Sequence, residues 1–360
     1  MITDDNSSCL RAALATKRVL LADGATGTNL FELGLQTGDS PELWNTDHPD
    51  RVTTLYNGFI NAGSDLILTN SFGGTRYRLG LHAAEDRVHE LNAAAARIAR
   101  EAVTASGRDV LVAGSMGPTG EILQPNGPLS IDDAAAAFAE QAAALRDGGA
   151  DVLWIETLSS REEIEAAVMG AETVGLPIVV TVSIDTNGRT MMGLTANDLA
   201  QTAAEVPQAI NAIGTNCGVG AAEVVAAIVN LSTATQGEKV KPIIVAKANC
   251  GIPEYVEGKI VYNGTPEIMA EYARLAIDAG ADIIGGCCGT SPAHVAAMRS
   301  AIDAHQKQAT MPAADAIVAS LGEVSKGALA QLQGDMSLAG GSASGRGSRR
   351  SRRGKRPQAT

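Results

Sequence analysis

Three cysteines follow two short aliphatic runs of the sequence: Cys217 in GTNCGVG, and the adjacent pair Cys287 and Cys288 in GGCCGTSPAH. If these runs are parallel strands of one barrel, the loops after them meet at one end, and the thiols converge although seventy positions separate them. Zn²⁺ accepts three thiolates, and this set leaves the fourth tetrahedral position open, as in a catalytic site. Taken singly, each cysteine is better explained as a small buried core residue. As a set at strand ends, they favour a metal site.

A zinc ion on three thiolates is suited to one kind of reaction. A fourth thiol bound there is deprotonated near neutral pH and stays electron-rich, and the thiolate is the nucleophile. A zinc hydrolase is the competing hypothesis. It would need a stronger Lewis acid and a general base beside the metal, and Glu156 is the one obvious loop carboxylate. The ligand set therefore predicts an alkyl transferase that acts on sulfur.

The elements that must position these residues alternate between strand and helix. Eight aliphatic runs are predicted strands: Val19–Ala22, Asp65–Thr69, Val110–Ala113, Val152–Ile155, Ile178–Val182, Ala212–Thr215, Ile243–Ala246 and Ile283–Ile284. Amphipathic, alanine-rich segments between them are predicted crossover helices: Glu85–Ala105, Ile131–Arg146, Arg161–Val174, Ala221–Leu231, Pro266–Ala279 and Pro292–Ala304. This alternation predicts an α/β protein with a closed (β/α)₈ TIM barrel. An open doubly wound sheet is the alternative, and the barrel is favoured because the unusual polar and glycine-rich segments all fall just after strands.

Three regions follow from the pattern. Residues 1–305 are the predicted barrel, and residues 306–339 form a C-terminal extension in which Ala313–Leu332 is expected to be one more helix. Residues 340–360 form an Arg-rich tail of Gly, Ser and Arg that cannot bury a core and is expected to be disordered.

Charge and composition limit the partners. The net charge is −12, and the last twenty residues carry seven Arg or Lys and no acid, so removing those seven charges leaves −19 on residues 1–340. Such an acidic body is a poor general binder of nucleic acid, although an arginine-rich tail is able to contact RNA or an acidic partner surface. No apolar run is long enough for a membrane span, and MITDDNSSCL lacks the pattern of a secretory signal. Five cysteines, two of them adjacent, make a poor disulfide framework, and we expect a cytoplasmic protein.

Six segments carry a resemblance to a known family: LLADGATGT, SDLILTNSFGGTR, GSMGPTGE, WIETL, GTNCGVG and GGCCGTSPAH. The chain resembles the homocysteine S-methyltransferase family from about Val19 to Arg299. That family includes the homocysteine-binding barrel of cobalamin-dependent methionine synthase, betaine–homocysteine methyltransferase and enzymes that use S-methylmethionine. The resemblance implies methyl transfer to the thiol of L-homocysteine, giving methionine. It also implies that Cys217, Cys287 and Cys288 hold one zinc ion per chain, with no covalent cofactor.

The same resemblance implies a binding site for the amino-acid end of homocysteine. Asp23 and Glu156 would bind the ammonium group, because paired carboxylates suit a cation. Backbone amides would help to hold the carboxylate, since a turn of exposed N–H groups suits an anion. The amides concerned are those from Gly24 through Ala25 and Thr26 to Thr28, and that of Ser115. Asn70 and Asn216 would orient ligands or loops. Without the cysteines, structural roles would be favoured for both acids, with Asp23 as a helix cap and Glu156 as an ion-pair partner. Each asparagine is explained equally well as a turn residue.

Two further residues need separate interpretation. Cys250 in AKANCGIPEY departs from the family pattern, which places a small residue there, and we interpret it as a bystander near the end of the seventh strand. His294, in TSPAH, lies within a predicted helix and is not counted as a metal ligand.

The methyl donor is less firmly indicated than the acceptor. Betaine or a related small onium compound is slightly favoured, because a single barrel is able to use a small donor alone and because Trp44, Phe72 and Tyr77 are candidates for an aromatic cage. Against betaine, Thr157 follows Glu156 where betaine enzymes carry Tyr. The alternative is the homocysteine-activating subunit of a split methionine synthase, which takes methyl from methylcobalamin on a separate corrinoid protein. A zinc-binding module without turnover ranks lower, since Asp23 and Glu156 are both present. An oligomer assembled through Ala313–Leu332 is left open.

Overall fold

The computed structural model describes residues 8–336, apart from residues 186, 208, 239, 252–253 and 257–258. The predicted disordered tail, residues 340–360, and the last residues of the predicted extension lie outside this part of the chain.

Eight parallel strands form a nearly closed barrel in the order β1-β10-β7-β6-β5-β4-β3-β2. Between the first and last members of this order, the Asp65 N–H donates to the Leu21 carbonyl at 2.6 Å. The strands are buried on both sides, which explains why they read as continuous aliphatic runs. All eight predicted strands are confirmed, and so is the TIM barrel. Their bounds are β1 Leu20–Leu21, β2 Leu66–Leu68, β3 Leu111–Met116, β4 Val152–Leu158, β5 Ile178–Ser183, β6 Ala212–Cys217, β7 Ile243–Ala248 and β10 Ile283–Gly286.

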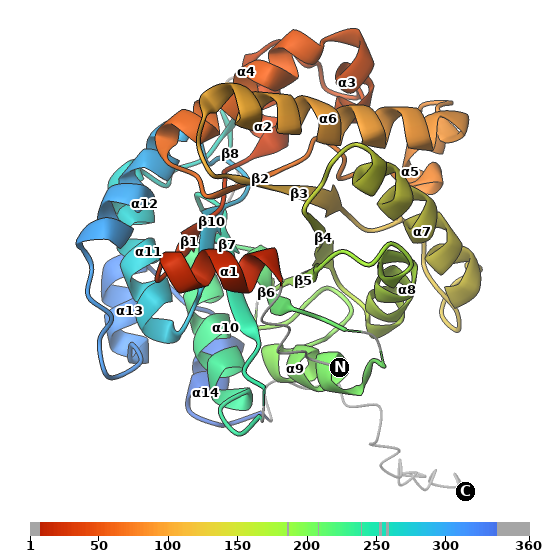
Figure 1. Ribbon diagram of the computed structural model, residues 1–360. Helices are drawn as coiled ribbons and strands as arrows, with labels where there is room; N and C mark the ends of the chain where they lie inside the picture. Colours follow the sequence, from red (N-terminus) through yellow and green to blue (C-terminus); the bar gives the residue numbers. More distant parts are fainter. Residues whose placement is uncertain are drawn as a thin grey trace, which may run out of the picture.

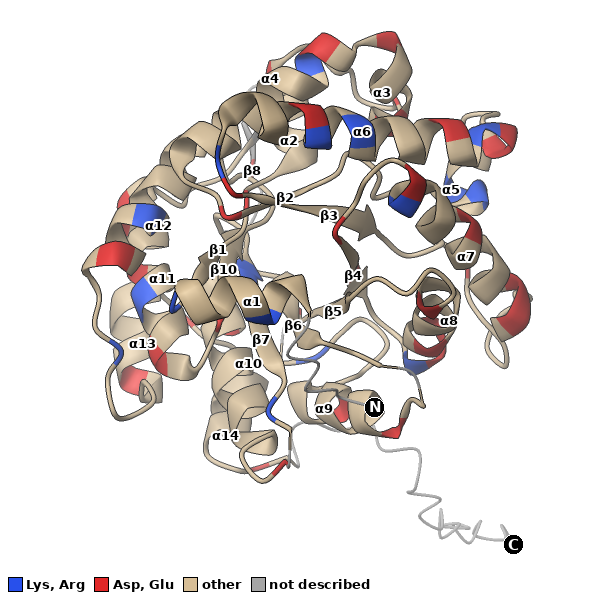
Figure 2. Cartoon of the chain, in the orientation of Figure 1, with Lys and Arg blue, Asp and Glu red and all other residues tan. Residues whose placement is uncertain are grey.

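Helices surround the strands (Figure 1). All six predicted crossover helices are present: α6 Val88–Ser106, preceded by a 3-10 turn at Glu85–Arg87, α7 Ile131–Asp147, α8 Arg161–Glu172, α10 Ala221–Ala234, α11 Pro266–Ala279 and α12 Pro292–Ala304. The ring is completed by α4 Pro49–Ala62 and α9 Ala196–Glu205, which follow β1 and β5. Shorter elements lie in the loops: α2 Thr26–Glu32, a 3-10 turn at Pro41–Leu43, α3 Trp44–Asp47, α5 Arg76–Gly80 and a hairpin of β8 Glu254–Val256 and β9 Lys259–Val261. Charged residues gather on the outer helices while the strands carry few (Figure 2).

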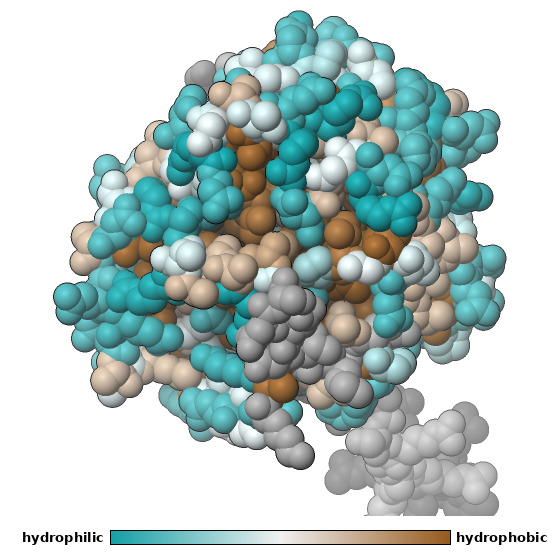
Figure 3. Space-filling model, in the orientation of Figure 1, coloured by the Kyte–Doolittle hydropathy of each residue, from teal (hydrophilic) through white to brown (hydrophobic). Residues whose placement is uncertain are grey.

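The helix α1 (Cys9–Thr16) lies across one end of the barrel in the view of Figure 1. Its Leu10 is fully buried in a cluster that includes Leu20 of β1, Val152 of β4 and Trp154. In the same view, hydrophilic surface covers most of the outer helices and apolar surface appears toward the middle (Figure 3). With this end covered by α1, the opposite end, where the strands have their carboxyl ends, is left for a site.

The C-terminal extension forms two helices, α13 (Ala314–Leu321) and α14 (Lys326–Leu332). The single helix predicted over Ala313–Leu332 is wrong in this respect, because Gly322 has φ of +97° and ends α13. Ile317 of α13 and Ala328 of α14 belong to the same apolar cluster as the barrel's outer core. Over the described residues, no helix is long and apolar enough to cross a membrane.

Candidate active site

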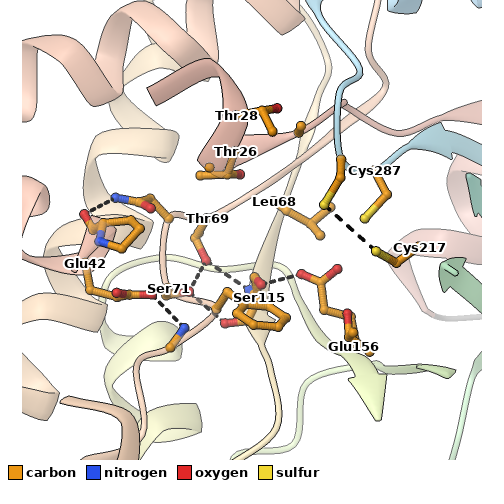
Figure 4. A pocket seen from close by; sticks show the side chains of 18 of the residues that line it. Thr26, Thr28, Glu42, Leu68, Thr69, Ser71, Ser115, Glu156, Cys217 and Cys287 are labelled. Atoms are coloured by element: carbon orange, nitrogen blue, oxygen red, sulfur yellow. Dashed lines mark hydrogen bonds between the residues drawn. The ribbon is translucent and has the colours of Figure 1, made fainter. Parts of the chain in front are cut away.

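A cavity of about 470 Å³ opens at the carboxyl ends of the strands, and its lining residues come from the ends of seven of the eight barrel strands or from the loops after them. Figure 4 shows the sulfurs of Cys217 and Cys287 on one side of this pocket, with Glu156 below them and Glu42 on the far side. Many of the predicted site residues line it: Gly24, Ala25, Thr26, Asn70, Phe72, Ser115, Glu156, Cys217, Cys287 and Cys288. Several other lining residues were not predicted from the sequence: Phe31, Asp39, Glu42, Arg78, His82, Lys247 and Tyr262. Asp23, Trp44 and Tyr77 are not among the lining residues.

The three predicted metal-ligand cysteines converge in this pocket. Their sulfurs lie within 4.8 Å of one another, and those of Cys217 and Cys288 are 3.9 Å apart. Two sulfurs bound to one tetrahedral zinc at about 2.3 Å would be about 3.8 Å apart, so the spacing fits one ion. No other group of three His, Cys, Asp or Glu side chains among the described residues has this geometry. The residues present therefore fit a metal ion held by three thiolates.

The backbone around the cysteines is shaped to aim them. Cys217, the last residue of β6, has φ of +60°, a conformation that non-glycine residues adopt rarely and that clusters at functional sites. The Cys287 N–H donates to the Ala248 carbonyl at 2.7 Å, which fixes the end of β10 against β7. These two strand ends bring sulfurs from distant parts of the chain to one point.

Asn216 connects the cysteine strand with the strand that carries Glu156. Its Oδ1 accepts from the Thr157 N–H and from the Thr181 hydroxyl, at 2.9 and 2.7 Å, and its Nδ2 donates to Thr157 Oγ1 at 2.7 Å. The Nδ2 atom also lies 4.0 Å from Cys287 Sγ. These contacts tie the end of β6 to β4 and β5 next to Glu156 and Cys217, and an orienting role for Asn216 stays a prediction.

Lys247 is the principal residue that sequence analysis missed. Its Nζ lies 2.7 Å from Asp23 Oδ1, and the two side chains are only 2% and 1% exposed. Burial alone disfavours the ammonium form, but the charges of Asp23 and Glu156 offset it and raise the pKa of Lys247. Asp23 Oδ2 accepts the Leu68 N–H at 2.7 Å, so both carboxylate oxygens are occupied. Asp23 thus lies behind Lys247 instead of facing the pocket.

Glu156 does face the pocket. The Ser115 hydroxyl donates to its Oε1 at 2.5 Å. Burial raises the pKa of Glu156 to about 7, a shift that the positive charge of Lys247 opposes. Its side chain lines the cavity beside the cysteines, where its ionised form would bind a cation.

The predicted backbone donors are partly occupied. The Ala25 N–H donates to the Thr290 carbonyl at 3.0 Å, and the Ser115 N–H donates to Thr69 Oγ1 at 2.9 Å. Asn70 uses its Nδ2 within the loop, donating to Pro41 O and Asn45 Oδ1. The amides of Ala25 and Ser115 are therefore engaged before any ligand arrives.

A family comparison identifies the barrel. The family model described as homocysteine S-methyltransferase matches residues 20–302. The chain belongs to the homocysteine S-methyltransferase family.

Proteins similar to this homocysteine S-methyltransferase family member include two methionine synthases and a methyltransferase of known structure. The methionine synthase of Mycobacterium tuberculosis is 31% identical over 303 residues, which cover 80% of this chain and 25% of that protein. The methionine synthase of Mycobacterium leprae is 30% identical, over 79% of this chain and 24% of that protein. The chain thus spans about a quarter of the length of these relatives. The metallated homocysteine methyltransferase MmuM from Escherichia coli is 27% identical with a TM-score of 0.68, covering 81% of this chain and 99% of that one.

Of the three residues predicted to form an aromatic cage for the methyl donor, Phe72 lines the pocket, and Trp44 and Tyr77 do not. Trp44 is buried in α3, with Arg51 over its ring at 4.9 Å and His48 against its edge. Tyr77 packs against the main apolar cluster. The aromatic side chains that line the pocket are instead Phe31, Phe72 and Tyr262, because α2, the loop after β2 and the segment after β9 all reach it.

Cys250 and His294 lie outside the cluster of three cysteines. Cys250 is buried, and its Sγ lies 3.3 Å from Thr290 Oγ1, outside the cluster of three sulfurs. His294 Nδ1 contacts Ser291 in a capping box, and Nε2 lies 3.0 Å from the Gly264 carbonyl. His294 therefore stabilises the start of α12.

Proposed function

We propose that this chain transfers a methyl group to the thiol of L-homocysteine, giving methionine, at one zinc ion held by Cys217, Cys287 and Cys288. The convergence of three sulfurs within 4.8 Å in a pocket that also contains Glu156 is the observation that carries the proposal. Membership of the family supports the choice of acceptor. The five unpaired cysteines suit a reducing compartment, and we therefore place the protein in the cytoplasm.

The reaction is a displacement at carbon. When bound, zinc on three thiolates lowers the pKa of an incoming thiol and leaves its sulfur nucleophilic. The thiol proton leaves to solvent, the new sulfur–carbon bond forms, and the donor departs with the electron pair of its bond to the methyl group. Asn216 holds the strand ends that carry Cys217 and Glu156, so the chain itself contributes orientation.

A small onium donor is favoured by the pocket's lining. Phe31 and Phe72 both line the cavity and remain 43% and 36% exposed, and Asp39 and Glu42 line it too. Aromatic faces and carboxylates attract a quaternary ammonium or sulfonium group. We therefore favour betaine or a related small onium compound.

A separate corrinoid protein is the second candidate donor. The relatives named methionine synthase are about four times longer than the matched region, so most of each lies outside this barrel. On this alternative, the barrel is the homocysteine-activating subunit of a split enzyme.

Methionine formation by the zinc-loaded protein tests both candidates. Homocysteine would be supplied with betaine, S-methylmethionine or methylcobalamin in separate reactions, with chelator-treated protein as the control. Turnover with either onium donor supports the first candidate, and turnover with methylcobalamin alone supports the second. Absence of methionine with all three donors would overturn the proposed function.

Phe31→Leu and Phe72→Leu refine the donor test. Each should raise the KM for an onium donor, because cation–π contacts are lost while apolar volume is largely kept. Leu81→Ala is the matched control, since Leu81 is 70% exposed and does not line the pocket.

A further inference from the structure

The ammonium group of Lys247 has hydrogen-bond donors that no described residue uses. An ammonium group carries three N–H donors, and among the described residues Lys247 Nζ has one hydrogen-bond partner, Asp23 Oδ1. The side chain is buried and lines the pocket, whereas Asp23 does not. Its Nζ also lies 5.7 Å from the centre of the Trp154 ring, so an apolar floor lies on that side of the charge. Because a buried N–H donor without a partner is energetically costly, a hydrogen-bond acceptor on a ligand in the pocket would stabilise it.

Glu156 is the complementary group. Its Oε1 accepts from Ser115, and Oε2 has no hydrogen bond to any described residue. Lys247 and Glu156 both line the same cavity as the three cysteines. A ligand whose thiol lies at the cysteines therefore meets one positive and one negative side chain nearby.

The charges decide which end of an amino acid meets which residue. An α-ammonium placed beside Lys247 would be repelled, and Asp23, which was expected to bind it, is already neutralised by Lys247. An α-carboxylate beside Lys247 gains a charge-assisted hydrogen bond, as does an α-ammonium beside Glu156.

We propose that Lys247 binds the α-carboxylate of the thiol substrate and that Asp23 positions Lys247 instead of binding the substrate. Glu156 keeps the role that the family resemblance implies for it, which is to bind the α-ammonium group. This inference rests on the proposed function, because it takes homocysteine as the substrate.

Homocysteine analogues that lack one charged group separate the two roles. Binding to zinc-loaded protein would be measured by calorimetry for homocysteine, for 4-mercaptobutanoate, which lacks the amino group, and for 3-mercaptopropan-1-amine, which lacks the carboxylate. Lys247→Met should weaken the first two thiols about 10- to 100-fold and leave the aminothiol unchanged. Glu156→Gln should weaken homocysteine and the aminothiol and leave 4-mercaptobutanoate unchanged.

Zinc content and thermal unfolding of each variant provide the controls. If Lys247→Met fails to fold because Asp23 is left unpaired, Asp23→Asn combined with Lys247→Met removes both charges and should show the same analogue pattern. Equal weakening of all three thiols by the lysine substitution, or weakening of the aminothiol alone, would overturn the inference and leave the proposed function standing. Failure of the unsubstituted zinc protein to bind homocysteine would overturn both.

Discussion

Asn216 forms two hydrogen bonds with Thr157: its Oδ1 accepts the Thr157 N–H at 2.9 Å, and its Nδ2 donates to the Thr157 hydroxyl at 2.7 Å. Thr157 has φ of +64° and directly follows Glu156, while Asn216 directly precedes Cys217. One buried amide therefore sets the position of Cys217, a proposed metal ligand, relative to the pocket carboxylate.

Asn216→Ala should weaken homocysteine binding by about tenfold while zinc is retained, because the groups that orient Glu156 lose their partner. The free energy of unfolding should fall by at least about 2 kcal/mol, since buried donors on Thr157 and Thr181 are left unpaired. Asn211→Ala is the matched control: Asn211 is buried at the opposite end of β6 and accepts the Ile178 N–H at 2.8 Å. It should lose comparable stability with unchanged affinity, and a similar loss of affinity in both variants would contradict the orienting role.

Replacing any of the three clustered cysteines by Ala should abolish zinc retention, from one equivalent per chain to less than about a tenth, because two thiolates and water make a much weaker site. Cys250→Ala should keep its zinc, since Cys250 lies outside the cluster. Metal analysis after dialysis measures this directly. Full zinc content in any one of the three ligand variants would rule out that cysteine as a ligand.

Gly24→Ala and Gly27→Ala should have opposite effects on stability. A Cβ on Gly24 would lie 2.5 Å from the Thr290 carbonyl oxygen and 2.8 Å from the Phe59 ring, so we expect a loss of about 1–3 kcal/mol. A Cβ on Gly27 meets nothing within 4 Å and lies within α2, so we expect a gain of up to about 1 kcal/mol. Denaturant unfolding curves of the two variants provide the comparison, and equal midpoints would show that the segment between β1 and α2 is not packed as described.

Ile317→Ala should lower the free energy of unfolding by about 2–4 kcal/mol, because Ile317 of α13 is fully buried in the barrel's outer core. Its neighbour Val318 is 37% exposed, and Val318→Ala should cost far less. If both substitutions were equally mild, the extension would not be an integral part of the folded barrel.

The strands and several helix bounds were predictable because local sequence determines them. Buried parallel strands read as unbroken aliphatic runs, and Thr265 before Pro266 and Ser291 before Pro292 mark the starts of α11 and α12, whose predicted bounds are confirmed. The two helices of the extension were less predictable, because the stop at Gly322 depends on its backbone conformation.

The side-chain contacts within the pocket could not be predicted from the sequence. The partner of Lys247 lies 224 positions away, and periodicity gives no sign of it, although a lysine inside the run PIIVAKANC was a signal that a buried partner was required. Trp44 is near the right loop, but sequence does not reveal that its ring packs against Arg51 and His48. The cysteine cluster was accessible because strand ends of a barrel meet on one face.

Zinc X-ray absorption spectroscopy of the purified protein, before and after homocysteine is added, would show whether the substrate thiol binds a zinc ion held by the three cysteines. We expect three sulfurs at about 2.3 Å and one lighter atom before addition, and four sulfurs afterwards. A sulfur count that homocysteine does not change would contradict thiol activation at this metal, and a count below three at the outset would contradict the assignment of Cys217, Cys287 and Cys288.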